Sequence, residues 1–273
     1  MSLSFLLASA KAAITGGAVT LAVSVLAAPS YAASLVPVDL ELWLGVDVSG
    51  SISLSEFNLQ KNGYANAFNS SALQNVIASS TNGVAVGYGY WSSSNLQNVA
   101  VNWTLLKTAQ DVTNFAAAIA ATTRPFGGST AVGAAIDFGV NQILTNAFEG
   151  AQKTIDISGD GTNNSGRQPA LARNAAAAQG ITINGLAIGN QSFETYYKNN
   201  VITADGFVIR TPDLLGFEAA IKQKLTREIG DGIVVPPGPV STPEPVSGLA
   251  LGMAGIGLMA FRKRGERGQS RAN

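Results

Sequence analysis

Short apolar runs and helical stretches alternate along residues 34–232. This alternation is typical of an α/β fold, in which helices cover a mainly parallel sheet. The apolar runs predict six strands, at 40–46, 84–91, 99–105, 153–158, 181–188 and 207–209. Helical spacing predicts the main helices at 54–68, 109–121, 131–144, 169–179 and 217–229. We therefore expect a single Rossmann-like domain over 33–232, with a doubly wound central sheet between helices.

The first 32 residues predict a secretory signal peptide. Lys11 is the only charged residue before Asp39, and an apolar run over 12–28 follows it. Small residues at Ser30 and Ala32 suit a signal peptidase, so we expect cleavage after Ala32 and export of the chain. The alternative interpretation is an N-terminal membrane anchor that is retained.

The C-terminal end predicts a second targeting segment. A Pro-rich linker over 233–245 is followed by an apolar run at 246–261 and a basic tail that reaches 273. The apolar run is shorter than the roughly 20 residues of a comfortable membrane span, so membrane contact there is transient or permanent. Pro243-Glu244-Pro245, this run and Arg262-Lys263-Arg264 together resemble the PEP-CTERM sorting signal of Gram-negative bacteria. That resemblance implies processing by an exosortase and a place in the cell envelope or the exopolysaccharide matrix.

Composition restricts the chemistry that the chain can perform. Its 273 residues contain neither histidine nor cysteine, which excludes imidazole and thiolate metal sites and the Ser-His-Asp triad. Any metal must therefore have oxygen ligands, as Mg²⁺, Ca²⁺ and Mn²⁺ prefer. Residues 33–245 hold 11 basic and 16 acidic side chains, so this part is acidic and no nucleic-acid partner is expected.

Three polar loops carry the candidate site. The segments 47–51, 127–130 and 158–161 are each expected to follow a strand, where ligands bind in an open α/β sheet. In the second segment, glycines allow a tight path and place a threonine at a helix N-terminus. The loops supply five oxygen-bearing side chains: Asp47, Ser49, Ser51, Thr130 and Asp160. Two carboxylates and three hydroxyls leave about one position of an octahedral site for another ligand.

Asp-x-Ser-x-Ser at 47–51, with Thr130 and Asp160 downstream, closely resembles the metal-ion-dependent adhesion site of the von Willebrand factor type A superfamily. The resemblance is closest to an uncharacterised exported bacterial branch, through the segments 158–164, 183–188, 196–197 and 224–229. It implies that Ser49, Ser51 and, in the ligand-competent state, Thr130 coordinate a divalent cation directly, and the carboxylates directly or through water. Mg²⁺ is expected ahead of Ca²⁺ or Mn²⁺, with the open position taking an acidic group of a protein or polysaccharide.

Several neighbouring residues allow a second interpretation. Tyr88, Tyr90 and Trp91 are compatible with a sugar-stacking platform, but their position in a strand favours the core. Asn163 and Asn164 could contact a ligand or serve the turn. Asp137 and Asp156 are expected to be a helix-face and a strand residue, and no chemistry is assigned to them.

Three functions are compatible with these patterns. The first is an exported, metal-dependent binding or adhesion module that is not an enzyme. The second is a structural matrix protein without a specific ligand. The third is a metal-dependent hydrolase in which Asp47 and Asp160 hold an activating metal, although no general base is evident for it.

Overall fold

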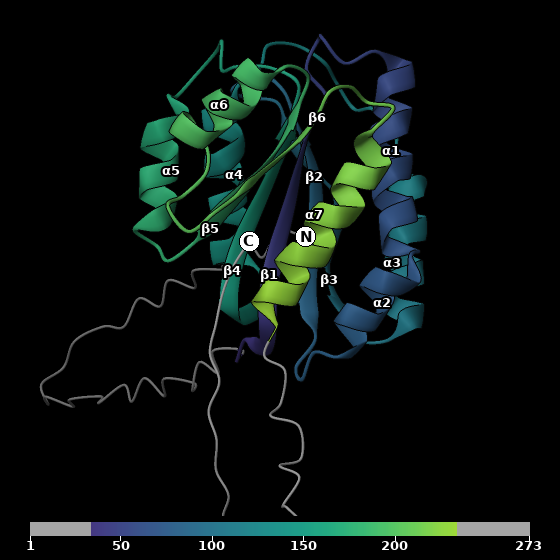
Figure 1. The fold of residues 1–273 in the computed structure, drawn as a ribbon. Coiled ribbons are helices and arrows are strands. Elements are labelled where there is room, and N and C mark those ends of the chain that lie inside the picture. Colours follow the sequence, from purple (N-terminus) through teal and green to yellow (C-terminus); the bar gives the residue numbers. More distant parts are fainter. Residues whose placement is uncertain (1–33, 234–273) are drawn as a thin grey trace, which may run out of the picture. The chain divides into compact units, whose positions relative to one another are not determined.

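A computed structural model describes residues 34–233, and Figure 1 shows helices on both faces of one central sheet. The predicted signal peptide, almost all of the Pro-rich linker and the predicted sorting segment lie outside the described residues. None of the helices within 34–233 is long and apolar enough to cross a membrane.

The sheet confirms the predicted fold class. Its strand order is β3-β2-β1-β4-β5-β6, with β3 antiparallel to β2 and every other neighbouring pair parallel. The strands are β1 (Val36–Asp47), β2 (Val84–Trp91), β3 (Gln97–Leu106), β4 (Phe148–Gly159), β5 (Thr182–Ile188) and β6 (Val208–Thr211). The order changes direction at β1, which lies between β2 and β4, so the carboxyl ends of β1 and β4 border a switch point.

Two strands begin earlier than the apolar pattern predicts. β1 and β4 extend to Val36 and Phe148, and these extensions pair with each other. The β4 extension has exposed polar residues, Glu149 and Gln152, and the β1 extension contains Pro37 and Asp39, so no hydrophobic run marks them. Backbone pairing between the two strands explains the extra length.

Seven helices lie within residues 34–233: α1 (Leu54–Phe68), α2 (Ser71–Ala78), α3 (Ala109–Ala120), α4 (Val132–Thr145), α5 (Pro169–Ala177), α6 (Gln191–Asn200) and α7 (Phe217–Gly232). In Figure 1, α1, α2, α3 and α7 lie on one face of the sheet and α4, α5 and α6 on the other. The predicted capping box of α1 forms, since Ser53 Oγ accepts from Glu56 N and Glu56 accepts from Ser53 N. The short helices α2 and α6 were not predicted; α6 buries only Tyr197.

Each face of the sheet has its own apolar core. Tyr88 and Tyr90 belong to the core beneath α1, and Trp91 belongs to the core beneath α4. All three are at most 1% exposed, which confirms the core interpretation over a sugar-stacking platform. Trp43 from β1 fills the second core together with residues of α4 and α5. β1 contributes residues to both cores and β4 contributes Ile155 and Ile157 to the second, so packing holds these strands and the loops that follow them.

Candidate metal centre

The first loop begins at the last residue of β1. Ser49 N donates a 2.7 Å hydrogen bond to Asp47 Oδ1, which turns the chain back toward the strand end. The Ser49 and Ser51 hydroxyls lie 3.2 Å apart. Asp47 and Ser49 are fully buried, whereas Ser51 is exposed. The loop therefore has a buried carboxylate, from Asp47, and a hydroxyl that faces solvent, from Ser51.

The third predicted loop meets the first one directly. Because β1 and β4 are adjacent and parallel, with Val46 opposite Ser158, the residues that follow them share one edge of the sheet. Ser51 Oγ donates a 2.8 Å hydrogen bond to Asp160 Oδ1. The Asp160 carboxylate thus contacts the Ser51 hydroxyl, which lies beside that of Ser49, in the same loop as Asp47.

The loop that carries Thr130 connects different elements from those predicted. The expectation that its loop follows a strand is wrong, because that loop connects α3 to α4. Thr130 also precedes the N-cap residue of α4, which is Ala131. The loop is held in place by its neighbours rather than by a strand end. Gly50 N donates to Gly128 O at 2.7 Å, and a β-carbon at Gly161 would lie 3.8 Å from the Thr130 hydroxyl.

Asn164 connects the Thr130 loop to the Asp160 loop. Thr130 N donates to Asn164 Oδ1 at 2.9 Å, and Asn164 N donates to Thr130 O at 2.9 Å. Asn163 Oδ1 accepts from Gly133 N in the first turn of α4. These contacts assign both asparagines to the turn, which was one of the two interpretations of the sequence.

Gly128 allows the close contact between the loops. Its φ of +146° lies in a region that side chains disfavour, and a β-carbon there would collide with the Ser93 hydroxyl. The same hydroxyl accepts from Ser129 N at 3.0 Å. The loop after β2 therefore also supports the Thr130 loop.

Burial disfavours an uncompensated negative charge on the Asp47 carboxylate. Burial raises the pKa of Asp47 to about 7; the Ser49 amide opposes this shift and the nearby charge of Asp160 adds to it. Burial also raises the pKa of Asp160. Asp47 Oδ2 and the Tyr197 hydroxyl are buried without a hydrogen-bond partner. A β-carbon at Gly159 would lie 2.9 Å from the first atom and 2.6 Å from the second.

Arg124 is a further residue at this site that the sequence did not reveal. Its guanidinium Nη2 donates to the carbonyl oxygens of Val48 and Ser49 at 2.9 and 2.8 Å. Its Nε donates to Phe126 O at 3.1 Å. This side chain holds the first loop against the segment that leads to Thr130. Its position 75 residues from Ser49, in an irregular segment, gives no sequence signal for the contact.

The donor set fits a hard divalent cation. All five predicted side chains carry oxygen, and Asp47 Oδ2 is an orphaned buried acceptor of the kind that a cation satisfies. Within residues 34–233, no three acidic side chains gather closely enough to hold a metal by themselves. A cation here would therefore depend on the serine and threonine hydroxyls as well as on the carboxylates.

The tether between the loops gives a first testable prediction. Asn164→Ala is expected to lower the free energy of unfolding by about 1–3 kcal/mol, because the Thr130 N–H loses its acceptor in a partly buried place. Urea denaturation measures this change. Asn95→Ala, at an exposed loop position, serves as the control and is expected to stay within about 0.5 kcal/mol of the wild type. Equal effects of the two variants would contradict the assigned tether.

A sequence model described as "Protein of unknown function (DUF1194)" matches residues 37–233. The chain belongs to this family. The match covers the whole sheet, apart from the first residue of β1, and all three loops of the site. No curated protein matches this DUF1194 member.

Solved structures show that this DUF1194 chain has a von Willebrand factor type A fold. Proximal thread matrix protein 1 from the mussel byssus, with a zinc-occupied MIDAS motif, aligns over 70% of this chain at 16% identity and a TM-score of 0.53. Pilus adhesin SpaC from Lactobacillus rhamnosus GG aligns over 71% at 15% identity and a TM-score of 0.52. A von Willebrand factor type A protein from Catenulispora acidiphila aligns over 71% at 16% identity and a TM-score of 0.50. The alignments cover 46%, 30% and 42% of those chains, so the DUF1194 chain spans less than half of each.

Proposed function

We propose that this protein is a divalent-metal-dependent binding module. Asp47, Ser49, Ser51, Thr130 and Asp160 would hold the cation, with Mg²⁺ ahead of Ca²⁺ or Mn²⁺. The observation that carries the proposal is that three loops meet at the end of β1 beside Asp47, whose buried Oδ2 has no hydrogen-bond partner. The zinc-occupied MIDAS motif of the mussel matrix protein, which has the same fold, supports it.

The residues of the chain have separate parts in this function. A bound cation would supply local positive charge and one open coordination position for a carboxylate of the partner. Asp47 and Asp160 would balance part of that charge, and the exposed Ser51 would mark the side from which a partner enters. Because residues 33–245 are acidic overall, a metal bridge would overcome their repulsion of an anionic polymer or protein.

We propose binding rather than catalysis for this site. The proposed ligands account for the two acidic side chains at its centre, and the chain has no histidine or cysteine to act as a general base or nucleophile. Neither the family match nor the shared fold implies a reaction. The partner would therefore be retained through the metal and not transformed.

The location of the protein is a proposal of its own. The signal peptide expected at 1–32 and the PEP-CTERM-like tail from Pro243 would deliver the chain to the envelope or the exopolysaccharide matrix, with an exosortase as processing partner. The apolar run at 246–261 would make the membrane contact. A matrix protein and a pilus adhesin among the structures of the same fold support a place outside the cell.

Binding of the purified chain to an immobilised polyuronate tests the function. Retention is expected with Mg²⁺, lost in chelator, and absent on the methyl ester of the same polymer, which lacks the carboxylates. Ser49→Ala should reduce retention at least 10-fold, whereas Ser55→Ala, an exposed serine next to the site, should leave it unchanged. Retention that survives both chelator and Ser49→Ala would instead favour the matrix protein without a specific ligand.

A further inference from the structure

Two buried polar atoms without hydrogen-bond partners lie beside the carboxyl end of β1. They are Asp47 Oδ2 and the Tyr197 hydroxyl, and neither residue has exposed surface. A β-carbon at Gly159 would lie 2.9 Å from the first atom and 2.6 Å from the second, so the two oxygens lie within about 5.5 Å of each other. Buried polar atoms without partners are rare in folded proteins, and two of them this close together indicate a common role.

The side chains of Asp47, Trp91 and Tyr197 lie on the same face of the sheet. Asp47 and Trp91 are paired across β1 and β2, and paired residues of neighbouring strands direct their side chains to the same face. Trp91 and Tyr197 both belong to the core beneath α4. The Trp91 ring would lie 3.3 Å from a β-carbon at Gly159, so an aromatic edge borders the same point as the two oxygens. A hydrogen bond made beside such an apolar group is strengthened, because the local dielectric constant is low.

Two glycines make room for Tyr197 at this position. Besides Gly159 of β4, Gly185 of β5 lies under the tyrosine ring, where a β-carbon would be 2.7 Å from Tyr197 Cδ1. Neither of these two glycines has a positive φ, so the backbone conformation does not require glycine there. The close approach of Tyr197 to the two strands explains both glycines.

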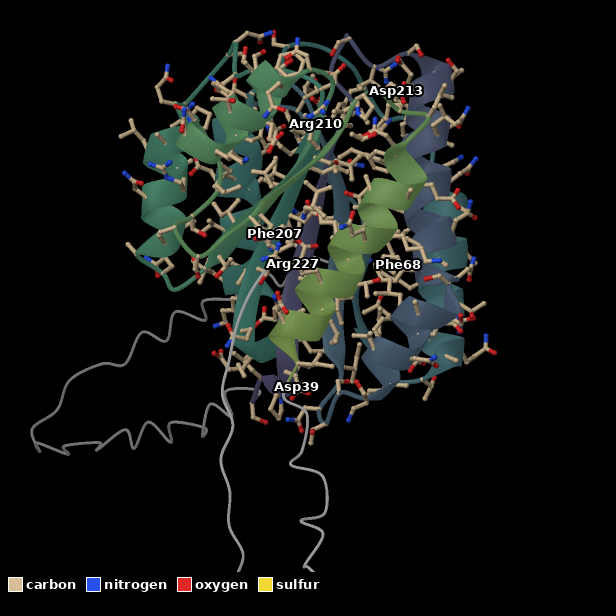
Figure 2. All side chains as sticks on the ribbon, in the orientation of Figure 1. Asp39, Phe68, Phe207, Arg210, Asp213 and Arg227 are labelled. Carbon is tan, nitrogen blue, oxygen red and sulfur yellow. The ribbon has the colours of Figure 1, made fainter. Side chains whose placement is uncertain are left out.

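Contacts with β6 fix the helix that carries Tyr197. Arg210 Nη1 donates to Gly189 O at 2.9 Å, just before α6, and Arg210 Nε lies 3.5 Å from Glu194 Oε2 in the first half of the helix. Figure 2 shows Arg210 on β6 at the end of the sheet where Figure 1 places α6. The polar helix α6 is therefore held at the carboxyl ends of the strands, and Tyr197 is the residue that it buries there.

The Tyr197 hydroxyl is suited to donate a hydrogen bond to Asp47. A phenol keeps its proton at neutral pH, and burial raises the pKa of Tyr197 well above 10. Asp47 Oδ1 already accepts from Ser49 N, whereas Oδ2 has no partner. A carboxylate oxygen has two lone pairs, so Oδ2 can accept from a hydroxyl group and also ligate a cation. No direct hydrogen bond joins the two oxygens, and a gap of this size is short enough for one bridging water.

We propose that Tyr197 is a positioning residue of the metal centre, whose hydroxyl donates through one water to Asp47 Oδ2 and so orients this carboxylate toward the cation. The proposal rests on the metal function proposed above and adds a residue of α6 to it. Carboxylates that ligate metals are commonly held by a further hydrogen bond, and loss of such a partner lowers metal affinity by about 10–100-fold.

Calorimetric titration of the purified protein with MgCl₂ tests the proposal. Tyr197→Phe removes the hydroxyl but keeps the ring that packs on Gly159 and Gly185, and it is expected to weaken Mg²⁺ binding by about 10-fold or more. The control is Tyr88→Phe, which removes a buried hydroxyl from the other core and should bind Mg²⁺ like the wild type. Equal affinities of the wild type and Tyr197→Phe would overturn the proposal and leave the metal function intact. A wild type that binds no Mg²⁺ would overturn both.

A metal-free measurement separates positioning from packing. In chelator, Asp47→Asn and Tyr197→Phe act on the same hydrogen bond, so the melting-temperature shift of the double variant should differ from the sum of the single shifts by at least about 2 °C. Asp47→Asn combined with Tyr88→Phe should give additive shifts. Additive shifts in the Tyr197 pair would refute the contact with Asp47. A Tyr197→Phe variant that melts earlier but keeps its Mg²⁺ affinity would assign Tyr197 to packing alone and overturn the proposal.

Discussion

Replacing Lys224 with methionine is expected to lower the free energy of unfolding by about 3–5 kcal/mol. Methionine fills much of the same volume but leaves Asp156 and Glu228 as two buried carboxyl groups with no positive charge beside them. Breaking a buried ion pair on one side is costly, because the remaining charge can neither reach water nor find a counter-ion. Urea denaturation at pH 8, where both carboxyls tend to ionise, measures the change.

The matched control is Lys222→Met on the exposed face of the same helix. This substitution is expected to change stability by less than about 0.5 kcal/mol, because no buried charge depends on it. A Lys224→Met variant that costs no more than the control would show that the buried cluster of Asp156, Lys224 and Glu228 contributes little.

Part of the pH dependence of the wild type follows from the same cluster. Burial raises the pKa of Glu228 from 4.5 to about 7, so between these values the folded state binds more protons than the unfolded state. The free energy of unfolding contributed by Glu228 therefore falls as pH rises through this window, and Glu228→Gln should remove that slope. Tyr64, which faces the cluster from α1, remains neutral because burial raises its pKa well above 10. The penalty of Lys224→Met should likewise be smaller at pH 5 than at pH 8.

The sequence could predict those parts of the fold that a repeating pattern marks. Strands buried on both faces, such as 84–91, appear as apolar runs, and the box at Ser53 and Glu56 marks the start of α1. The helix α6 could not be found in this way, because its ten residues are mostly polar and only Tyr197 is fully buried. Packing against neighbouring elements, rather than its own periodicity, keeps it in place.

The residues of the candidate site likewise fall into those that the sequence could predict and those that it could not. Asp47 and Asp160 end or follow parallel neighbours in the sheet, so their proximity could be expected from the order of the elements. Arg124 and Tyr197 lie far from Asp47 in the sequence, and no local pattern marks either of them as part of the site. Lys224 and Glu228 look like an ordinary i,i+4 pair on a helix surface, and only the tertiary fold places Asp156 beneath them. Contacts of this kind depend on three-dimensional packing that one sequence does not display.

Replacing Asp47 with asparagine is expected to have opposite effects with and without a divalent cation. In the metal-free protein, the amide oxygen of the new side chain would still accept from Ser49 N, and the substitution would remove a buried carboxylate whose pKa is raised to about 7. The new amide nitrogen would lie near the Tyr197 hydroxyl, which lacks a partner. At pH 8 the metal-free variant should therefore melt a few degrees above the wild type, at roughly 2–4 °C per kcal/mol.

With the cation present, the order should reverse. Loss of a proposed ligand charge should weaken Mg²⁺ binding by about 100-fold or more, so the melting temperature of the variant should not respond to concentrations that stabilise the wild type. Differential scanning calorimetry of both proteins, in chelator and in Mg²⁺, provides the four values needed.

The two effects together separate a ligand from a structural residue. If Asp47 only held the turn through Ser49, asparagine would keep the turn, and the two proteins would respond equally to Mg²⁺. If Asp47 binds the cation, its buried carboxylate makes the metal-free wild type less stable than the asparagine variant. A variant that still responds to Mg²⁺ like the wild type would place the cation elsewhere, and a variant that is less stable in chelator would show that the Asp47 carboxylate stabilises the metal-free fold. Only a variant that is more stable in chelator and does not respond to Mg²⁺ fits a role of the Asp47 carboxylate, whose Oδ2 has no hydrogen-bond partner, as a metal ligand.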